Sequence, residues 1–117
     1  MKYNNEGIRR KDRLMGEKRA IELLSSSEYG IMSMVDENDQ PYGIPLNFVW
    51  DGGACIYIHC SPVGRKMDIL RRHDRVSFCI IGNVGLQPSR FTTEYESVVI
   101  YGKAAIVYND NERMEAI

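Results

Sequence analysis

Apolar and polar residues alternate along several short segments of the chain, which is the pattern of half-buried β-strands. Turn-forming residues separate these segments, at Asp36–Gln40 and again at Asp51–Gly53. Pro45 lies inside one segment, and because proline cannot donate to a sheet ladder we expect that position at an edge, a bulge or a ligand. The pattern predicts strands over Tyr29–Val35, Pro41–Trp50, Ala54–Cys60, Arg75–Gly82 and Glu94–Tyr108, the last as one long strand or two short ones.

Two segments carry helical signals. Apolar residues recur at helical spacing in Gly16–Ser26, so we expect a helix there, as part of an N-terminal helical arm that starts near residue 9. A shorter helix is expected over Gly64–Arg72, with Ser61 able to cap it and Pro62 suited to a first helical position.

The C-terminal half contains two less regular segments. Asn83–Thr93 includes Gly85 and Pro88, and we expect an irregular, mobile active-site loop. Asn109–Asn111 can cap a last helix over Glu112–Ile117. That helix would stop after about two turns, so we expect a truncated helix and a native chain that continues.

Short strands joined by hairpins, with one helix between the third and fourth strands, favour a mainly β fold. The expected architecture is a small antiparallel β-barrel, closed or nearly closed, with flanking helices. Strict alternation of strands and helices is absent, which argues against a doubly wound parallel sheet. At 117 residues the chain can bury one core without disulfides or metals, so we expect a single domain over residues 1–117.

The charge and cysteine content narrow the classes of partner. The formal net charge is -1 and the pI is near 6.1, so we expect no nucleic-acid partner. The basic run Arg9–Arg13 is expected to be a solvated arm or helix face, and the alternative is a contact with nucleic acid. No secretory signal or bilayer-spanning apolar run is found, and we expect a cytoplasmic protein without a membrane partner. Cys55, Cys60 and Cys79 have no metal-binding spacing, so we expect free thiols and no metal site.

The segment His59–Leu70 carries the clearest sign of binding chemistry. A β-rich run leads through a Ser-Pro-x-Gly turn into a helix that starts with Arg65 and Lys66. Backbone N–H groups, the positive end of the helix dipole and two cationic side chains would meet there, and Gly64 would let a ligand approach the backbone. We therefore expect a phosphorylated cofactor; the alternative is a solvated helix start, in which both cations oppose the helix dipole.

Several stretches resemble the FMN-binding split-barrel superfamily of pyridoxamine 5'-phosphate oxidase. They are Asp39–Phe48, Ile56–Lys66 and Arg75–Phe78. Within that superfamily the chain is most similar to the nitroimidazole-resistance (Nim) branch, to which Arg9–Arg13, Phe91–Val98 and Gly102–Ala104 also point. The resemblance runs from about Arg9 to Ile117, and it implies a homodimer with FMN in a cleft between the subunits.

The resemblance also implies a set of site residues by matching position. Arg65 and Lys66 would bind the FMN phosphate, His59 and Cys60 would lie close to the cofactor, and Ser97 takes the place of a polar flavin contact. The strand backbone along the isoalloxazine ring and the ribityl chain would come from Ile44, Pro45, Leu46, Asn47 and Phe48.

Two departures from the oxidase argue against vitamin B6 oxidation. Ile44 stands where the oxidase has an arginine that contacts flavin, and the oxidase's C-terminal substrate-binding segment has no counterpart before Ile117. The implied activity is FMN-dependent reduction of small molecules, with 5-nitroimidazoles as candidate substrates. The alternative is a non-catalytic module that binds flavin or haem.

Two of the implied site residues have structural alternatives. His59 would move a proton near the flavin, or it is a strand-end histidine bonded to backbone. Cys60 is either a redox thiol or a small buried residue.

Overall fold

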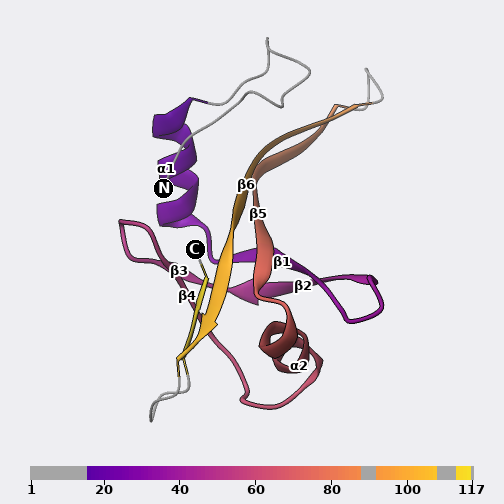
Figure 1. Cartoon of the computed structure of the whole chain (residues 1–117). Helices are drawn as coiled ribbons and strands as arrows, with labels where there is room; N and C mark the ends of the chain where they lie inside the picture. Colours follow the sequence, from indigo (N-terminus) through magenta and orange to yellow (C-terminus); the bar gives the residue numbers. More distant parts are fainter. Residues whose placement is uncertain (1–15, 88–91, 108–112, 117) are drawn as a thin grey trace.

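The computed structural model of the chain describes residues 16–87, 92–107 and 113–116, with side chains over 16–82 and 96–107. Helices and strands follow one another in these residues as drawn in Figure 1. They are α1 (Glu17–Ser26), β1 (Tyr29–Val35), β2 (Pro41–Asn47), β3 (Val49–Trp50), β4 (Ile56–His59), α2 (Arg65–Arg72), β5 (Arg75–Gln87), β6 (Thr92–Ile106) and β7 (Arg113–Ala116).

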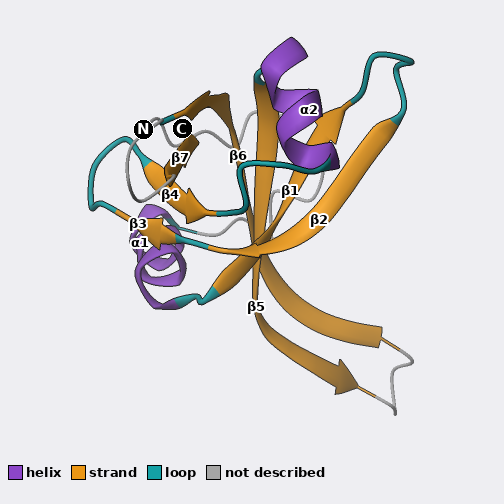
Figure 2. Ribbon diagram, turned by 90° about the horizontal axis from the view of Figure 1, so that it is seen from below, coloured by secondary structure: helices purple, strands orange, loops and turns teal. Residues whose placement is uncertain are grey.

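The strands form one antiparallel sheet in the order β2-β1-β5-β6-β7-β4-β3. The strands at the two ends of this order, β2 and β3, are consecutive in the chain, and only Phe48 separates them. The sheet therefore curves until its two ends come together, as Figure 2 shows. This confirms the predicted mainly β, antiparallel barrel architecture with flanking helices. It also places Pro45 on an edge strand of the sheet order, where its missing N–H breaks no inner ladder.

The core fills the inside of the curved sheet. On β1 the buried residues alternate with more exposed ones, so that Met32 and Met34 point inward while Ser33 points outward. Helix α2 adds the buried side chains of Met67, Ile69 and Leu70. The most deeply buried large side chains are Phe78, Met32, Met34, Ile56, Ile58 and Ile80. Each such side chain contributes about 1.5–3 kcal/mol on removal from water, before the entropy cost of ordering it.

The two helices cover different parts of the sheet. Helix α1 packs against β3 and β5, and Leu23 lies so close to β5 that a Cβ at Gly82 would be 2.4 Å from its Cδ2 atom. Arg19 of α1 also donates two hydrogen bonds of 2.8 Å to the Glu96 carboxylate on β6. Helix α2 packs against β1 and β6, at the end of the molecule opposite the β5–β6 arm (Figure 1).

The segment predicted to be an irregular loop is mostly strand. Strand β5 continues to Gln87 and β6 begins at Thr92, so the prediction for Asn83–Thr93 is wrong apart from residues 88–91, which lie outside the described residues. The pairing resumes after a register shift between Gly82 and Gly85. A bulge of this kind absorbs irregular sequence spacing while the ladder hydrogen bonds continue. The paired strands project from the barrel as an arm (Figures 1 and 2).

The predicted C-terminal helix is wrong over the part that the structure describes. Residues Arg113–Ala116 form β7, which pairs with both β4 and β6. A strand between two others gains ladder hydrogen bonds on both sides, and this gain outweighs the weak helical propensity of so short a segment. The expected helix cap at Asn109–Asn111 and residues 9–15 of the N-terminal arm lie outside the described residues.

The start of α2 also differs from the prediction. The helix begins at Arg65 after Gly64, which has a φ of 127°, a value that favours glycine. Ser61 is therefore not the helix cap and Pro62 is not its first residue. The Ser61 hydroxyl instead accepts the Val63 N–H at 3.4 Å, which stabilises the turn before the helix.

Other differences at element ends are small. The strand expected over Pro41–Trp50 is interrupted at Phe48, and the one expected over Ala54–Cys60 shortens to β4. In the described part of the chain, neither helix combines the length and apolar character that a membrane crossing requires. Cys55, Cys60 and Cys79 form no disulfide, and the described residues contain no cluster of metal-ligating side chains.

Candidate functional site

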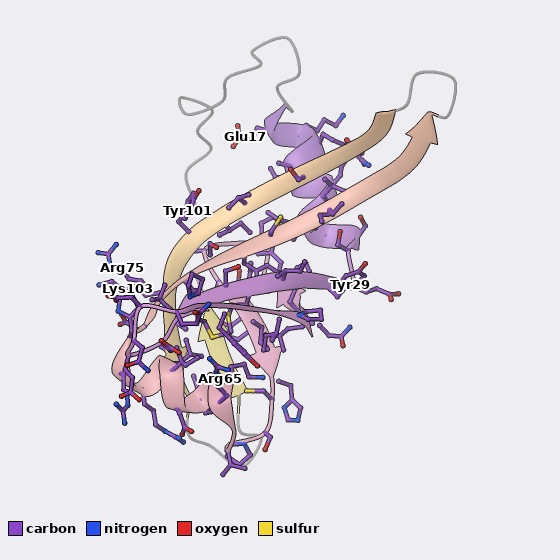
Figure 3. All side chains as sticks on the ribbon, turned by 90° about the vertical axis from the view of Figure 1, so that its right-hand side faces the viewer. Glu17, Tyr29, Arg65, Arg75, Tyr101 and Lys103 are labelled. Carbon is purple, nitrogen blue, oxygen red and sulfur yellow. The ribbon has the colours of Figure 1, made fainter. Side chains whose placement is uncertain are left out.

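The N-terminal end of α2 carries the two cations predicted to bind phosphate. No side chain caps the helix at Gly64, so its first backbone N–H groups point toward solvent or a ligand. The Arg65 guanidinium lies over the ring of Tyr42 on β2, with its Cζ atom 4.5 Å from the ring centroid. It also donates from Nη2 to Oδ2 of Asp36 at 3.2 Å. Figure 3 labels Arg65 at the end of the barrel where α2 lies.

Asp36, in the turn between β1 and β2, is the acidic neighbour of this site. Its carboxylate accepts the backbone N–H groups of Asn38 at 2.8 Å and Gln40 at 2.9 Å. Those two N–H groups, and then the Arg65 guanidinium, hold the pKa of Asp36 below its ordinary value. Asp36 is thus a fixed, ionised carboxylate beside one of the two cations.

The other charges around α2 leave its N-terminal end positive. Asp68 in the first turn is 3.6 Å from Arg71. Glu37 is paired with Arg72, at the opposite end of the helix. Lys66 is half-buried and has no ion-pair partner among the described residues. Lys66 therefore supplies a positive charge next to the positive end of the helix dipole, and no carboxylate of the described residues is paired with it.

A cleft of about 390 Å³ lies alongside β4, where β2 passes into β3. Its lining is Asn47, Phe48, Val49, Tyr57, Ile58 and His59. The Asn47 side-chain amide is fixed, because it donates to the Glu28 carbonyl oxygen at 3.1 Å. The Phe48 ring packs edge-on against Phe78, with ring centroids 5.1 Å apart, whereas His59 is exposed. Apolar and aromatic walls with a few polar side chains suit a flat ring system.

Strand β2 joins the cationic end of α2 to this cleft. Tyr42 near one end of β2 lies under Arg65, and Asn47 at the other end lines the cleft. A strand rises about 3.3 Å per residue, so the two positions are roughly 17 Å apart along β2. The backbone of one strand thus runs from a phosphate-type site to a ring-type site.

A third surface lies on the outside of the sheet, and we call it the outer sheet face. It comprises Ile31, Pro45, Cys79, Ile81, Ser97, Val99 and Tyr101. The register places four of these in one row across β2, β1, β5 and β6: Pro45, Ile31, Cys79 and Val99. Val99 is 49% exposed and Tyr101 is 81% exposed. Figure 3 views β5 and β6 from the side opposite α1, with Tyr29 and Tyr101 labelled.

The predicted site residues fall into separate places in the structure. Arg65 and Lys66 are at the start of α2, and Asn47, Phe48 and His59 share the cleft. Pro45 and Ser97 are exposed on the outer sheet face, so neither lines the cleft. Ile44 and Leu46 are half-buried and pack against the core.

Cys60 lies between the cleft and α2 and is half-buried. Its thiol is 3.8 Å from the sulfur of Met67, a buried residue of α2. This contact directs the side chain toward the core, as expected for a small buried residue.

Sequence reasoning missed five residues of these sites: Asp36, Tyr42, Val49, Tyr57 and Ile58. Tyr42 is two positions before Ile44, so strand alternation alone would have placed both on the same face. From the sequence, Asp36 is recognisable only as a turn residue. Its contact with Arg65 could not be predicted, because it joins positions 29 residues apart and depends on how α2 packs.

Residues 16–117 match the family model of pyridoxamine 5'-phosphate oxidase. No curated protein matches the chain.

Solved structures share the fold at low sequence identity. A candidate 5-nitroimidazole antibiotic resistance protein from Bacteroides thetaiotaomicron matches with a TM-score of 0.73 and 16% identity, over 88% of this chain and 80% of that one. An FAD-binding protein from Mycobacterium smegmatis matches with a TM-score of 0.68 and 16% identity, over 88% and 87%. HutZ, the heme storage protein of Vibrio cholerae, matches with a TM-score of 0.63 and 18% identity, over 85% and 68%. At these identities the similarity shows a shared fold and nothing further about this chain.

Proposed function

This chain belongs to the pyridoxamine 5'-phosphate oxidase family of split-barrel proteins, and from that premise we propose that it is an FMN-dependent oxidoreductase acting on small molecules. We propose 5-nitroimidazoles as the substrate class to test first. The observation that carries the proposal is the uncapped start of α2 with Arg65 and Lys66, joined by β2 to the apolar cleft.

The start of α2 has the chemistry that a phosphate monoester requires. Backbone N–H groups, the helix dipole and the Lys66 ammonium all favour an anion there. Arg65 adds a planar guanidinium whose parallel N–H groups match the spacing of phosphate oxygens. FMN carries such a phosphate at the end of its ribityl chain, so this end of the site selects FMN over flavin without phosphate.

The cleft suits the ring of the cofactor. FMN supplies the two-electron chemistry when it is bound, while the protein binds and orients it. The aromatic and aliphatic walls formed by Phe48, Val49 and Tyr57 would exclude water from one side of the ring. His59, exposed in the same cleft, would hold or release a proton at an imidazole nitrogen.

We propose that the site is completed by a second copy of the chain. Ser97 matches a polar flavin contact of the family by position, yet it is exposed on the outer sheet face and lines no part of this chain's cleft. One row of this face, formed by Pro45, Ile31, Cys79 and Val99, is also apolar and continuous across four strands, which is typical of a surface covered by a partner. A homodimer that buries this face would bring Ser97 of one copy toward the cleft of the other.

The first prediction tests the phosphate site. Arg65→Ala with Lys66→Ala should lose most of the copurified FMN while the fold is kept, because both charges are exposed or half-buried and outside the core. Losing two charged phosphate contacts should weaken FMN binding by roughly 100-fold or more, at about 1.5–3 kcal/mol per contact. The measurement is the ratio of flavin to protein absorbance, with circular dichroism as the check of folding.

The matched control is Arg75→Ala with Lys103→Ala. These two exposed cations are neighbours across β5 and β6 and lie apart from Arg65 in Figure 3, so their removal changes net charge equally but should leave FMN bound. Stoichiometric FMN in the Arg65/Lys66 variant, or equal loss in both variants, would contradict the phosphate assignment.

Wild-type protein purified with its flavin also distinguishes an oxidoreductase from a non-catalytic flavin-binding module. Anaerobic reduction of bound flavin by NAD(P)H or another donor, followed by reoxidation with a 5-nitroimidazole, identifies an oxidoreductase. A protein that binds flavin but does not reoxidise with any acceptor is a binding module. The exposed imidazole of His59 in an apolar cleft also fits haem, and a Soret band that disappears in His59→Ala would identify that cofactor instead.

A further inference from the structure

The turn between β1 and β2 folds back onto α2 and touches both of its ends. Asp36 pairs with Arg65 at the first residue of the helix, and Glu37 pairs with Arg72 at the last. The two acidic residues are adjacent in the turn, yet they reach opposite ends of the helix. Only the first of these ion pairs involves a residue of the proposed phosphate site.

Asp36 is held rigidly before it meets Arg65. Its Oδ1 atom accepts the N–H groups of Asn38 and Gln40, and its own backbone N–H donates to the Gln40 carbonyl oxygen at 3.0 Å. Its Oδ2 atom faces Arg65. The Asp36 side chain is 16% exposed, so the carboxylate is a fixed acceptor on a closed turn.

Arg65 is confined on two sides but keeps most of its donors. The Tyr42 ring lies under its guanidinium and Asp36 binds Nη2. A guanidinium has five N–H donors, and in the described part of the chain only this one bond uses them. The Arg65 side chain is 58% exposed, so the remaining donors are accessible to a ligand.

We propose that Asp36 is a positioning residue that, with Tyr42, pre-orients Arg65 for the phosphate monoester of the cofactor. A long arginine side chain normally loses much rotational freedom when it binds an anion, and here that freedom is already restricted before binding. The proposal rests on the proposed FMN function. Asp36 has two opposing effects on FMN binding: its negative charge repels the phosphate, and its contact with Arg65 orients a guanidinium that attracts the phosphate. The proposal predicts that the orienting effect is the larger of the two.

The direction in which FMN affinity changes in Asp36→Asn shows which of these effects is larger. Asp36→Asn removes the charge but leaves a side-chain oxygen that still accepts from Asn38 and Gln40, so the turn is kept. We expect this variant of the full chain to bind FMN roughly 3- to 10-fold more weakly, where tenfold corresponds to about 1.4 kcal/mol. Binding of riboflavin, which lacks the phosphate, should not change.

The matched control is Glu37→Gln, which removes the same charge from the same turn and frees Arg72 instead of Arg65. Its FMN affinity should stay within about twofold of wild type. Tighter FMN binding in Asp36→Asn would show that the carboxylate competes with the phosphate, and would overturn the proposal. Equal changes in both variants, or parallel loss of riboflavin binding, would overturn it as well.

The mobility of the Arg65 side chain, measured by NMR without cofactor, tests the positioning role of Asp36 independently of the proposed FMN function. In cofactor-free protein the Arg65 Nε–H resonance, assigned from its absence in Arg65→Lys, should report a restricted side chain. It should become mobile in Asp36→Asn and stay restricted in Glu37→Gln. Failure of wild type to bind FMN would refute the proposed function alone, whereas an Arg65 equally mobile in wild type and Asp36→Asn would refute the positioning role.

Discussion

Gly30 in β1 has no room for a side chain. A Cβ at this position would lie 2.3 Å from Cε1 of Phe78 and 2.8 Å from the carbonyl oxygen of Cys79. Phe78 is 1% exposed and packs edge-on against Phe48, whose ring lines the cleft. A single glycine therefore keeps the aromatic wall of the proposed flavin site in place, through two successive contacts.

Gly30→Ala should lower the free energy of unfolding by about 1–3 kcal/mol, because the added methyl group overpacks a rigid ring and a backbone oxygen. Chemical denaturation measures the change. Gly43→Ala is the control, since it adds the same methyl group on the paired strand, where the nearest atom is Ser33 Oγ at 3.4 Å. The control should stay within about 0.5 kcal/mol of wild type. Equal stability of the two variants would contradict the packing argument.

At the scale of elements, α1 is attached to the sheet by one apolar and one polar contact. Leu23 packs on Gly82, and Arg19 binds both oxygens of Glu96, which precedes Ser97 on β6. The Glu96 carboxylate, and then that of Glu22, raise the pKa of Arg19 above its ordinary value. The bidentate geometry orients α1 along β6 more specifically than a single ion pair would.

Arg19→Met should loosen α1 without unfolding the barrel. The amides of its inner turn, around Leu23, should exchange with solvent several-fold faster, while those of α2 stay unchanged. Hydrogen exchange followed by mass spectrometry or NMR measures this. Glu22→Gln removes only the exposed partner of Arg19 on the same helix and should have little effect. Faster exchange in α2 as well would indicate global destabilisation instead.

For the whole molecule, the outer sheet face leaves Ile81, Val99 and Tyr101 exposed to solvent. It lies on the side of β5 and β6 opposite α1, so no element of this chain covers it in the part the structure describes (Figure 3). The proposed dimer would bury it and would make each flavin site depend on two copies. Assembly and cofactor binding would then be coupled, because each stabilises the other.

Val99→Glu should convert the proposed dimer to a monomer and weaken FMN binding at the same time. A charge at a buried interface without a partner is costly, and loss of the second copy would remove Ser97 from the proposed site. Sedimentation at several protein concentrations gives the oligomeric state, and flavin absorbance gives the occupancy. Ile21→Glu is the control, an equally apolar residue, 43% exposed on α1, that should leave the dimer intact. A wild-type monomer with full FMN occupancy would contradict the dimeric site.

Features that depend on contacts a few residues apart could be predicted from the sequence alone. Alternation predicted β1 and the hairpin into β2, helical spacing predicted α1, and the order of Gly64, Arg65 and Lys66 predicted the positive end of α2. These follow from local backbone geometry and from one apolar face that must be buried. The resemblance then named the family that the comparison with known families confirms.

Features that depend on distant partners arise only when the whole chain has folded. Residues 113–116 form a strand because β4 and β6 lie on either side, and β5 and β6 continue past residue 82 because each pairs with the other. The pairing of Asp36 with Arg65 arises in the same way, since the free energy comes from a turn and a helix that meet only when the barrel closes. Local propensity is weak compared with such contacts, so no local sequence pattern predicted these strands or this ion pair.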